Sequence, residues 1–597
     1  MQFDPPRLKD VSTVVYDTET TGLDWKTKKV CGYVITLGPR EDDTFYFPVR
    51  HGQGDNCDAG QVEKWIQTEI AARDDIRIVG HHLKFDLHFS ANHNIEFKGP
   101  VECTMVNACL INEYMPSFSL DGVSKYHGVQ VKKGEALYQH LAEEFGGEAN
   151  RRQMGNYWKL DAQDPLAHEY AKGDGTSTWQ VWEEQQRLID EDDLRTVHDL
   201  ECRVLRTLFR MERRGVRVDE QRLGQVRQHV ESEIERVSKS LPDGFNPRSS
   251  IQMQEYFADC KDEWNLTPKG NPSFTEDWLK EREKGRDIIT LRKFTNLVNS
   301  FLGPLAEKHI HNGRVHTNFN QLRGEAFNFE DKGSLARLSS SQPNMQQVPK
   351  HNKELAVLFR SVFVPDEGER WLSMDYSQQE YRIFSYYTKS RKLIGGYLSD
   401  PPIDMHGTVA QMMNVDRDTT AKRMNMGLIN WIGVAKLAAS LGCTEKQAKL
   451  YKRQYFHQFP EVKLFLDKAK SICESRHPVP YAKTILGRKQ RFPGKEKRFT
   501  YRSSSRYVQG TCADMCKLKM VECDDMGYTP LLQIHDSLDF SIPIAEIKEA
   551  KAKIEERMMA FGPGDVIDLT LKVGTVPMAV DIGEGASWKE ATFGADE

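Results

Sequence analysis

The chain has 597 residues, 28% of them charged, which is enough for roughly three to five domains with several cores. Its mean hydropathy of −0.61 and the lack of any apolar run near the ~18 residues of a membrane span exclude a membrane-embedded protein, and the composition is not that of a disordered chain. The start MQFDPPRLKD has no targeting pattern, and eleven cysteines without a CxxC pair indicate reduced thiols in an intracellular protein.

Three short acidic segments mark the first part of the chain. Residues 14–16 (VVY) predict a buried strand, and Asp17 and Glu19, two apart on an extended chain, would project from one face of it. Tyr170 and Asp174 in YAKGD are one helical turn apart and would share a helix face. Carboxylates and a phenol are the groups that two divalent metal ions and an attacking water need for phosphodiester hydrolysis. With Asp86 in GHHLKFDL, the candidate hydrolytic set is Asp17, Glu19, Asp86, Tyr170 and Asp174.

Helices are predicted for the next stretch. The chain is helical after Asp174, and we place a first domain boundary near residue 190. Residues 220–316 are polar and helix-rich, which suits a mobile subdomain that grips DNA and, nearly as well, a helical spacer without a core. Further on, TEKQ at 444–447 has the capping-box pattern of a helix start. A buried apolar helical face is predicted within residues 200–219, formed by Val204, Leu205, Leu208, Phe209 and Met211.

Two aspartates occupy turn positions in the second half. Asp375 follows the apolar residues 371–374 and so lies at a predicted strand end, while Asp536 lies between LLQI and LDFSI at a predicted hairpin turn. Two such carboxylates can anchor the two metal ions of phosphoryl transfer. Sequence alone does not show that they meet, and each by itself would read as a turn or cap residue.

A basic segment lies between these two aspartates. The formal net charge of −5 averages over all faces of the protein, whereas phosphate binding depends on local patches. The position of the segment favours a contact with the DNA backbone over a merely solvated face. Nine Lys or Arg residues stand there against the single acid Glu496: Lys483, Arg488, Lys489, Arg491, Lys495, Lys497, Arg498, Arg502 and Arg506.

These segments resemble two known families. The acidic segments are similar to those of DEDDy-type 3′→5′ exonucleases, in which the matching residues bind metal and the tyrosine helps to orient the water. The second half is similar to the family A DNA polymerases, the family of bacterial DNA polymerase I and several bacteriophage replicases. The matching segments occur in family order: RLSSSQPNMQQVP (337–349), DYSQQEYR (375–382), AKRMNMGLINW (421–431), TILGRKQRFP (484–493), YVQGTCAD (507–514) and QIHDSLDF (533–540), with VDIGEGASWKEA (580–591) near the end.

The resemblance covers nearly the whole chain and implies an α/β and α+β multidomain fold. A ribonuclease H-like exonuclease domain (1–190) would precede a right-hand polymerase domain (191–597). Its thumb would span about 220–316, its palm about 317–408 and 500–597, and its fingers about 409–499. The expected activity is that of a DNA-directed DNA polymerase with a proofreading 3′→5′ exonuclease.

The resemblance also implies roles for individual residues. Lys422 would contact the incoming triphosphate and support proton transfer to pyrophosphate, and Glu380 would block a ribose 2′-hydroxyl. Arg337 and Gln509 would read the minor groove at the primer terminus. The implied polymerase metal ligands are Asp375, Tyr376 and Asp536; the substrate-binding residues are Glu380, Arg382, Met426, Asn430, Arg417, Gln378 and His406; and the DNA-binding residues are Arg337, Gln346, Gln509, His535, Arg488 and Arg502.

Several positions depart from the family pattern. The arginine expected four residues before Lys422 is Asp418, and Arg417 lies one residue earlier, so a local bulge or a shifted helix start would be needed to restore its contact. The glutamate expected after Asp536 is Ser537, which leaves two aspartates, with Asp539 nearby, to bind metal. Three further departures are Met426 and Asn430 in place of aromatic residues and Trp431 in place of a glycine.

The resemblance implies primer–template DNA and dNTPs as partners, two Mg²⁺ ions at each site with Mn²⁺ as a substitute, and no membrane. We expect a compact, monomeric, phage-type replicative polymerase in the bacterial host cytoplasm, working with a replisome helicase-primase or a single-strand-binding protein. The exonuclease set starts close to residue 1, which leaves no room for a 5′-nuclease domain. The segment from residue 215 to residue 337 is too short for a thioredoxin-type processivity insertion.

Two other functions are open at this point. The departures in the fingers and at Ser537 fit a chain that acts mainly as a 3′→5′ exonuclease with an impaired polymerase half. A DNA-binding scaffold without activity is the other alternative. Retention of the residues with chemical roles in both halves favours the two-activity enzyme over both.

Overall fold

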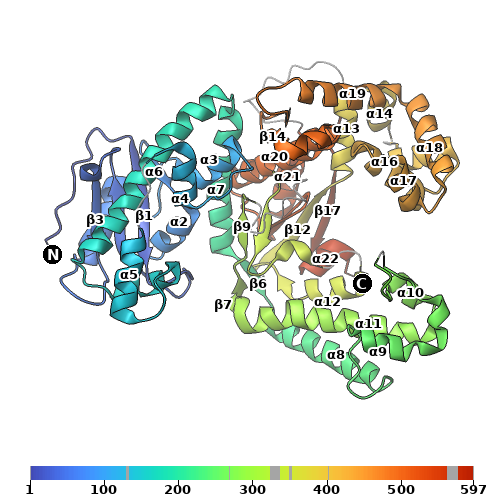
Figure 1. The fold of residues 1–597 in the computed structure, drawn as a ribbon, viewed down its shortest axis with the longest axis horizontal. Coiled ribbons are helices and arrows are strands. Elements are labelled where there is room, and N and C mark those ends of the chain that lie inside the picture. The colour runs from blue at the N-terminus through green and yellow to red at the C-terminus, as the bar shows by residue number, and fades with distance from the viewer. Residues whose placement is uncertain are drawn as a thin grey trace.

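The computed structural model describes residues 2–129, 134–267, 269–322, 336–348, 352–400, 403–560 and 576–595. Figure 1 shows the N-terminal part on the left and the rest of the chain arranged around a central sheet, with one group of helices above it on the right and another below. Among the described residues, no helix is both long and apolar enough to cross a membrane. All eleven cysteines are free thiols.

The N-terminal part is built on a five-stranded mixed sheet of order β3-β2-β1-β4-β5. The strand β2 runs antiparallel to both of its neighbours, β3 and β1, while β4 and β5 continue the sheet in parallel. Residues 14–16 are fully buried in β1, which confirms the strand predicted there. The strands are β1 (Thr13–Thr20), β2 (Val30–Thr36), β3 (Thr44–Pro48), β4 (Arg77–Gly80) and β5 (Val101–Cys103).

Two helices place functional residues against this sheet, and a third leads away from it. The helix α2 (Lys84–Ala91) carries Asp86, and the long α6 (Pro165–Glu191) carries Tyr170 and Asp174. Next comes α7 (Arg195–Arg214), whose predicted apolar face is buried as expected, with only Phe209 partly exposed. It ends at Gly215, where φ is 63° and a Cβ atom would lie 2.7 Å from the His316 ring, so the turn requires glycine.

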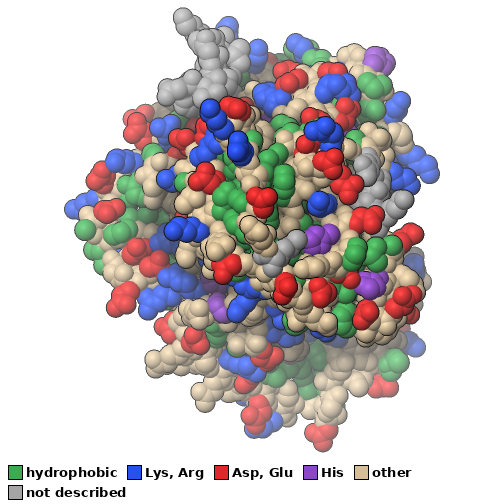
Figure 2. All heavy atoms as spheres, turned by 90° about the vertical axis from the view of Figure 1, so that its left-hand side faces the viewer, with side chains coloured by type: hydrophobic (Ala, Val, Ile, Leu, Met, Phe, Trp, Pro, Cys, Tyr) green, Lys and Arg blue, Asp and Glu red, His purple; other side chains and the backbone are tan. Residues whose placement is uncertain are grey.

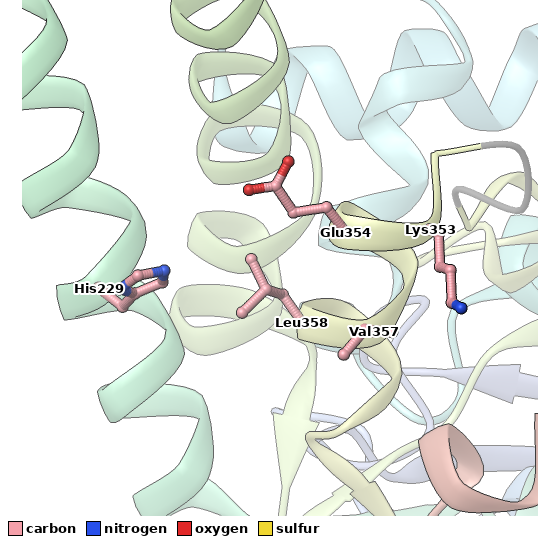
Figure 3. Close-up of a pocket in the computed structure, with 5 residues that line it drawn as sticks. All are labelled: His229, Lys353, Glu354, Val357 and Leu358. Atoms are coloured by element: carbon pink, nitrogen blue, oxygen red, sulfur yellow. The ribbon is translucent and has the colours of Figure 1, made fainter. Parts of the chain in front are cut away.

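The lower helices of Figure 1 form a small unit with a core of its own. The core corrects the alternative of a spacer without a core, because aromatic rings such as Phe257, Phe274 and Trp278 pack edge to face inside it. Its helices are α8 (Glu220–Ser238), α9 (Ser250–Tyr256), α10 (Glu276–Lys280) and α11 (Glu283–Leu297). An open hollow between α8 and α12 (Lys353–Arg360) is lined by His229, Lys353, Glu354, Val357 and Leu358 (Figure 3).

The central sheet has the order β15-β16-β12-β17 and is antiparallel throughout. Three segments that are far apart in the chain build this sheet. The helix α13 (Gln379–Thr388) and the buried helix α20 (Ser503–Asp525) belong to the same part of the molecule as the sheet. Its strands are β12 (Glu369–Tyr376), β15 (Leu532–Ile534), β16 (Ser537–Pro543) and β17 (Val580–Gly585). Smaller sheets contain β6 (Val216–Val218), β7 (Ile310–His311), β8 (Arg314–Val315), β9 (Asn318–Asn320), β10 (Ser339–Ser341), β11 (Phe363–Val364), β13 (Tyr481–Lys483) and β14 (Lys489–Arg491).

The upper helices of Figure 1 lie in the chain between β12 and the other three strands of the central sheet. They are α14 (Arg391–Leu398), α15 (Met405–Met413), the π-helical turn η8 (Arg417–Ala421), α16 (Lys422–Ile429), α17 (Val434–Leu441), α18 (Glu445–Gln458) and α19 (Pro460–Glu474). The predicted capping box at the start of α18 is confirmed, because Thr444 and Gln447 exchange side-chain and main-chain hydrogen bonds. Further helices are α1 (Ala59–Trp65), α3 (Thr104–Ile111), α4 (Leu120–His127), α5 (Gly134–Phe145), α21 (Ile547–Met559) and α22 (Trp588–Phe593). Short 3-10 or π segments are η1 (Glu41–Asp43), η2 (Ile66–Ala71), η3 (Arg151–Lys159), η4 (Ala258–Glu263), η5 (Val298–Leu302), η6 (Leu305–His309), η7 (Met345–Gln347) and η9 (Gly494–Arg502).

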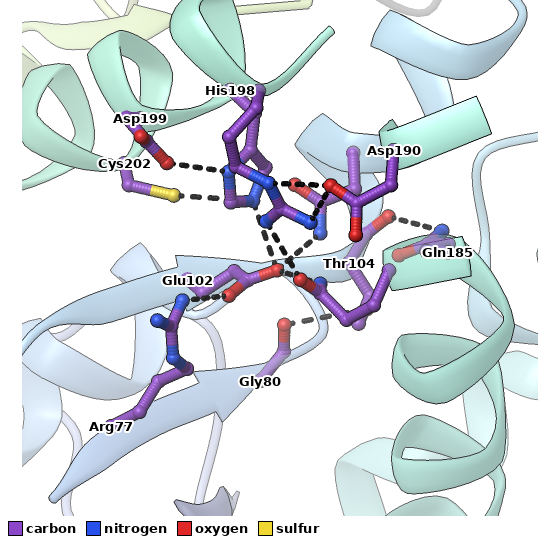
Figure 4. Close-up of polar contacts among 12 residues, drawn as sticks. Arg77, Gly80, Glu102, Thr104, Gln185, Asp190, His198, Asp199 and Cys202 are labelled. Atoms are coloured by element: carbon purple, nitrogen blue, oxygen red, sulfur yellow. Dashed lines mark hydrogen bonds and ion pairs between the residues drawn. The ribbon is translucent and has the colours of Figure 1, made fainter. Parts of the chain in front are cut away.

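A buried polar network fastens α7 to the first sheet (Figure 4). His198 on α7 contacts Glu102 on β5 at 3.0 Å, and Arg77 on β4 donates to the other oxygen of Glu102 at 2.7 Å. Burial alone would lower the pKa of His198, but its hydrogen bonds with Asp199, Cys202 and Glu102 outweigh burial and raise that pKa to about 12. His198 is therefore a charged partner for Glu102 at neutral pH.

Much of the basic segment faces the N-terminal part of the chain. Lys483 pairs with Asp193 at 2.6 Å, and Arg491 pairs with Glu113 at 2.8 Å and with Asp192 at 2.9 Å. These residues hold the two halves of the chain together, which corrects the prediction that the whole segment contacts DNA. Figure 2 shows basic and acidic side chains interspersed over the outer face of the N-terminal half. Lys495, Lys497, Arg498 and Arg502 are the exposed basic residues of the segment.

Candidate active sites

Three acidic side chains converge at the first sheet. Asp17 and Glu19 project from β1, and Asp174 approaches them from α6, so that one carboxylate oxygen of each lies within 4.8 Å of the others. Carboxylate oxygens at this spacing are the ligands that Mg²⁺ and similar hard cations take. Three of the predicted residues, from two separate sequence segments, therefore meet in space and fit a divalent metal ion.

Asp86 lies beside this group on α2. Its Oδ1 accepts hydrogen bonds from the main-chain N and from Oγ1 of Thr18, at 2.9 Å and 2.6 Å. Burial, and then the neighbouring charge of Asp17, raise the pKa of Asp86 well above its ordinary value. A cation bound between Asp17 and Asp86 would relieve that repulsion, so the electrostatics also fit a metal site.

Tyr170 stands one helical turn before Asp174, as predicted, and only 8% of it is exposed. Burial, together with the charges of Asp174 and Glu19, raises the pKa of the Tyr170 phenol far above its ordinary value. The phenol therefore keeps its proton and can act as a hydrogen-bond donor beside the acidic group.

The second pair of carboxylates lies at one end of the strands of the central sheet. Asp375 lies at the end of β12 and Asp536 in the turn between β15 and β16, which confirms both local predictions. Asp375 pairs with Ser537 in the β12–β16 register, and the main-chain N of Tyr376 donates to the carbonyl of Asp536 at 3.4 Å. The pairing of these strands supplies the convergence that the sequence could not show.

The sequence analysis did not predict a third carboxylate, Asp581, at this end of the sheet. Asp581 on β17 is the register partner of Asp375 on the side opposite Ser537. Directly opposed residues of antiparallel strands project from the same face of a sheet, so Asp581 stands beside Asp375. The segment VDIGEG contained the residue, but its position opposite Asp375 depends on the register of the last strand.

Neighbouring side chains narrow the set of metal ligands. Asp539 is 1% exposed, accepts a hydrogen bond from the Trp371 indole at 2.9 Å, and has a pKa raised by burial to about 6. Asp539 therefore lies in the interior of the sheet, which argues against the metal-binding role considered for it. The phenol of Tyr376 donates to the carbonyl of Met558 at 2.9 Å, so only its main-chain carbonyl is suited to a metal.

The π-helical turn η8 accounts for the shifted arginine. The main-chain N of Ala421 donates to the carbonyl of Asp416, five residues back, at 2.9 Å. One extra residue in this turn places Arg417 one turn before Lys422, where an ordinary helix would place residue 418. This is the local bulge that the sequence required. Arg417 pairs here with Asp404 and Asp418.

His406 lies beneath this helix in a neutral form. Burial lowers its pKa, and the cations Lys422 and Arg417 add to the effect against the opposing charge of Asp404. Its Nδ1 lies 2.7 Å from the side-chain amide nitrogen of Asn425 on α16. The Lys422 side chain itself is exposed at the start of α16.

The end of α16 holds the residues that replace the family's aromatic and glycine positions. Met426 is partly buried, and the Asn430 side chain donates to the carbonyl of Met426 at 2.9 Å. Trp431 adopts the left-handed conformation with φ of 50°, which is strained for a bulky residue. The helix therefore ends in the conformation that glycine favours, although tryptophan occupies the position.

Most remaining predicted contacts line the central sheet. Glu380 and Arg337 form an ion pair at 2.6 Å, which joins the proposed sugar-selecting and primer-contacting residues. Gln346 donates to the Gln533 side chain at 3.0 Å, beside the exposed His535. Of the others, Gln378 accepts from Tyr397 at 3.0 Å, Arg382 donates to the Ser377 carbonyl at 2.9 Å, and Gln509 is half-buried on α20.

Arg488 lies in the interior. It is 7% exposed and pairs with Glu201 and, at 2.7 Å, with Asp514. This placement argues against a DNA contact for Arg488. Arg502 is exposed and stacks on Phe499 at 4.6 Å.

Comparison with known proteins agrees with this geometry. Residues 216–590 match the model of DNA polymerase family A, and residues 6–183 match a 3′-5′ exonuclease model. The chain is 31% identical to the DNA polymerase DpoZ of Salmonella phage PMBT28, over 98% of both chains. It is 29% identical to a DNA-directed DNA polymerase of Pseudomonas phage M6, covering 91% of this chain and 87% of the relative.

The fold has a solved counterpart. The POL domain of Pol1 from M. smegmatis, in complex with DNA primer–template and dNTP, matches with a TM-score of 0.76 and 21% identity, over 98% of this chain and 97% of that one. The chain thus has the architecture of a polymerase preceded by a nuclease.

The chain belongs to DNA polymerase family A and carries a 3′-5′ exonuclease domain. It is a template-directed DNA polymerase with exonucleolytic proofreading, of the type found in phages. Enzymes of these families depend on divalent metal ions, generally Mg²⁺.

Proposed function

We propose that the two carboxylate sets are two separate active sites, one for DNA synthesis and one for proofreading. The observation that carries the proposal is that each set assembles at its own sheet, from segments distant in the chain. Two divalent ions at each site, Mg²⁺ or in its place Mn²⁺, would supply the charge that activates the attacking hydroxyl or water and neutralises developing negative charge.

At the synthetic site, Asp375 and Asp536 would hold the metal ions, with the carbonyl of Tyr376 and the carboxylate of Asp581 beside them. Lys422, with Arg417 brought onto the same side by η8, would bind the triphosphate, and neutral His406 would offer a ring N–H to it. Glu380 would exclude the ribose 2′-hydroxyl, and Gln378, Arg382, Met426 and Asn430 would complete the nucleotide pocket.

At the proofreading site, Asp17, Glu19, Asp86 and Asp174 would hold the metal ions. The protonated phenol of Tyr170 would orient the attacking water by hydrogen bonding. Primer–template DNA would reach both sites, with Arg337, Gln346, Gln509 and His535 at the primer side and Arg502 on the backbone.

The proposed domains are the exonuclease at 1–190 and the polymerase at 191–597, with the thumb at about 220–316, the fingers at about 409–499 and the palm on either side of the fingers. We further propose a monomeric replicative enzyme that acts in the cytoplasm of an infected bacterium. Replisome helicase-primase and single-strand-binding proteins are the partners that such a role calls for.

A primer-extension assay with Mg²⁺, run with and without dNTPs, tests this function. We expect extension when dNTPs are present and shortening of the primer when they are absent. Shortening under both conditions would show a nuclease with an impaired polymerase half, and no change under either would show a binding protein.

A further inference from the structure

Glu212, near the end of α7, is a buried carboxylate that no role above uses. It is 2% exposed, yet three donors from two other elements reach it. Lys84 and His88 of α2 contact its two oxygens at 2.5 Å and 2.7 Å, and the main-chain N of Phe319 in β9 donates to it at 2.5 Å. Burial would raise the pKa of Glu212, but Lys84 and His88 outweigh burial and hold that pKa below its ordinary value.

Lys84 and His88, the two residues of α2 that contact Glu212, lie on the helix face opposite Asp86. Lys84 and His88 are four residues apart, so they share one face of the helix. Asp86 is two residues from each and therefore projects from the opposite face. Thr18 holds that opposite face by donating to Asp86 at 2.9 Å and 2.6 Å. The helix is thus clamped between Thr18 in front and Glu212 behind.

Aromatic packing stiffens the rear clamp. The ring centroids of His88 and Trp25 stack at 4.7 Å, and the guanidinium of Arg213, next to Glu212 in the chain, lies 4.6 Å from the centroid of the same indole. A carboxylate held by these contacts can transmit the position of α7 to α2, because the protein interior is closely packed and Glu212 is buried.

The third contact leads to the polymerase side. Phe319 lies in β9, which pairs antiparallel with β10, and Phe319 itself faces Ser340 in that register. Arg337, the proposed primer contact, precedes β10 by two residues. One carboxylate therefore touches both the helix of a proofreading metal ligand and the strand beside the primer-binding segment.

We propose that Glu212 is a positioning residue for proofreading, which sets the placement of Asp86 from behind α2 and ties it to the polymerase strand β9. This inference rests on the proposed role of Asp86. Positional errors of about 1 Å at a reacting centre can reduce rates about a hundredfold, so a distant clamp can control kcat.

The test compares two buried carboxylates of the same helix. Glu212→Gln keeps the size but removes the charge that Lys84 and His88 face. Glu201→Gln is the matched control, because Glu201 is also 2% exposed on α7 but binds Arg488 and Lys517 instead of α2. Exonuclease kcat and KM on single-stranded DNA, extension of a matched primer, and amide hydrogen exchange in metal-free protein are measured for each.

For Glu212→Gln we expect exonuclease kcat to fall about ten- to a hundredfold with KM within about twofold, faster exchange of α2 amides, and extension within about twofold of wild type. Glu201→Gln should leave the exonuclease kcat and the α2 exchange unchanged. An exonuclease kcat within twofold of wild type in Glu212→Gln, with or without faster α2 exchange, overturns the inference.

Two further variants separate the possible causes. If Glu212→Gln does not fold, His88→Phe keeps the ring stacked on Trp25 and removes only the contact with Glu212, and the same loss of kcat is expected. Asp86→Asn tests the proposed metal site itself. Full exonuclease activity in Asp86→Asn would refute the role of Asp86, whereas an inactive Asp86→Asn beside a fully active His88→Phe would refute only the clamp.

Discussion

The proposed division of the carboxylates between two active sites can be tested residue by residue. Asp375→Ala or Asp536→Ala should abolish primer extension and leave primer degradation, because each removes a proposed ligand of the synthetic site alone. The double variant Asp17→Ala and Glu19→Ala should do the reverse. Loss of transition-state charge stabilisation of about 4 kcal/mol corresponds to roughly a thousandfold in rate.

Radiolabelled or fluorescent primers, followed with and without dNTPs, give both rates for each variant. Near-normal extension by Asp375→Ala would show that the assignment of the synthetic site is wrong.

Sugar selection is a second property of single residues. Glu380 is the proposed sugar-selecting residue, and its ion pair with Arg337 at 2.6 Å holds its carboxylate in position. Glu380→Ala should open space for a 2′-hydroxyl and raise ribonucleotide incorporation, relative to deoxyribonucleotide, by at least about tenfold, or 1.4 kcal/mol.

Single-nucleotide insertion kinetics measure this ratio. Glu380→Gln is the matched variant, because it keeps the size and removes the charge that pairs with Arg337; it should keep most of the discrimination. An unchanged ratio in an active Glu380→Ala enzyme would mean that another group guards the sugar.

The helix α16 shows how an element keeps its register after an irregular turn. The π-helical turn η8 absorbs the residue that displaces Arg417, so α16 after it keeps the expected register for Lys422, Met426 and Asn430. The left-handed Trp431 after the last turn is consistent with that register, because the family resemblance implies a glycine at this position.

This register predicts how the enzyme handles dideoxynucleotides. Methionine has no hydroxyl to replace the missing 3′-hydroxyl, so the wild type should discriminate against them. Met426→Tyr should improve their use by between about twofold and a hundredfold, the range of one hydrogen bond, neutral or charge-assisted. Insertion of ddTTP against dTTP measures the effect, with Met426→Phe as the control that should behave as the wild type does. Equal ratios of ddTTP to dTTP insertion for all three proteins would show that a residue other than Met426 occupies the place near the missing 3′-hydroxyl.

At this scale the sequence predicted local elements well. The strand before Asp17, the hairpin at Asp536 and the capping box at Thr444 are confirmed, because each follows from neighbouring residues. The acidic segments were found for the same reason. Asp581 was missed because its significance comes from strand pairing across more than half of the polymerase part, which no local pattern encodes.

Buried charges were also beyond local prediction. Arg488, Arg491 and Arg502 look alike in a basic run, yet the first two are buried against acids of other segments and only the third is exposed. Glu201 and Glu212 likewise interrupt the predicted apolar face of α7, and only tertiary contacts show why a carboxylate is stable there. Local patterns in the sequence thus point to the groups of the two proposed sites, whereas the groups that hold the structure together become visible only through tertiary contacts.

For the whole molecule, the His198–Glu102 pair makes stability depend on pH. The folded pKa of His198 is raised to about 12, so its stabilising effect is complete below the unfolded value near 6.5 and is lost as pH rises towards 12. The folded pKa of Glu102 is lowered to about 2, against burial, by His198 and its other donors, so its effect is complete above about 4.5 and is lost as pH falls.

His198→Gln should therefore cost most stability near pH 5–6.5 and less at pH 9, by at most about 1.4 kcal/mol for each pH unit above 6.5. Urea unfolding of both proteins at pH 6 and pH 9 measures the difference. Arg77→Gln is the control, because it removes a different cation from the same carboxylate. An equal cost of His198→Gln at both pH values would contradict a charged His198.

The position of β17 in the chain affects the order in which the protein folds during its synthesis on the ribosome. The central sheet needs β12, β16 and β17, so the proposed synthetic site cannot close until β17 has emerged. The first sheet is complete by residue 103, and the residues of the nuclease site have all been made by residue 174. Domains tend to fold as they emerge from the ribosome, so a partly synthesised chain would contain the nuclease part before the polymerase part has folded. If Glu212 clamps α2 only after α7 and β9 have docked, the growing chain delays its own cutting activity until the part that copies DNA has begun to form.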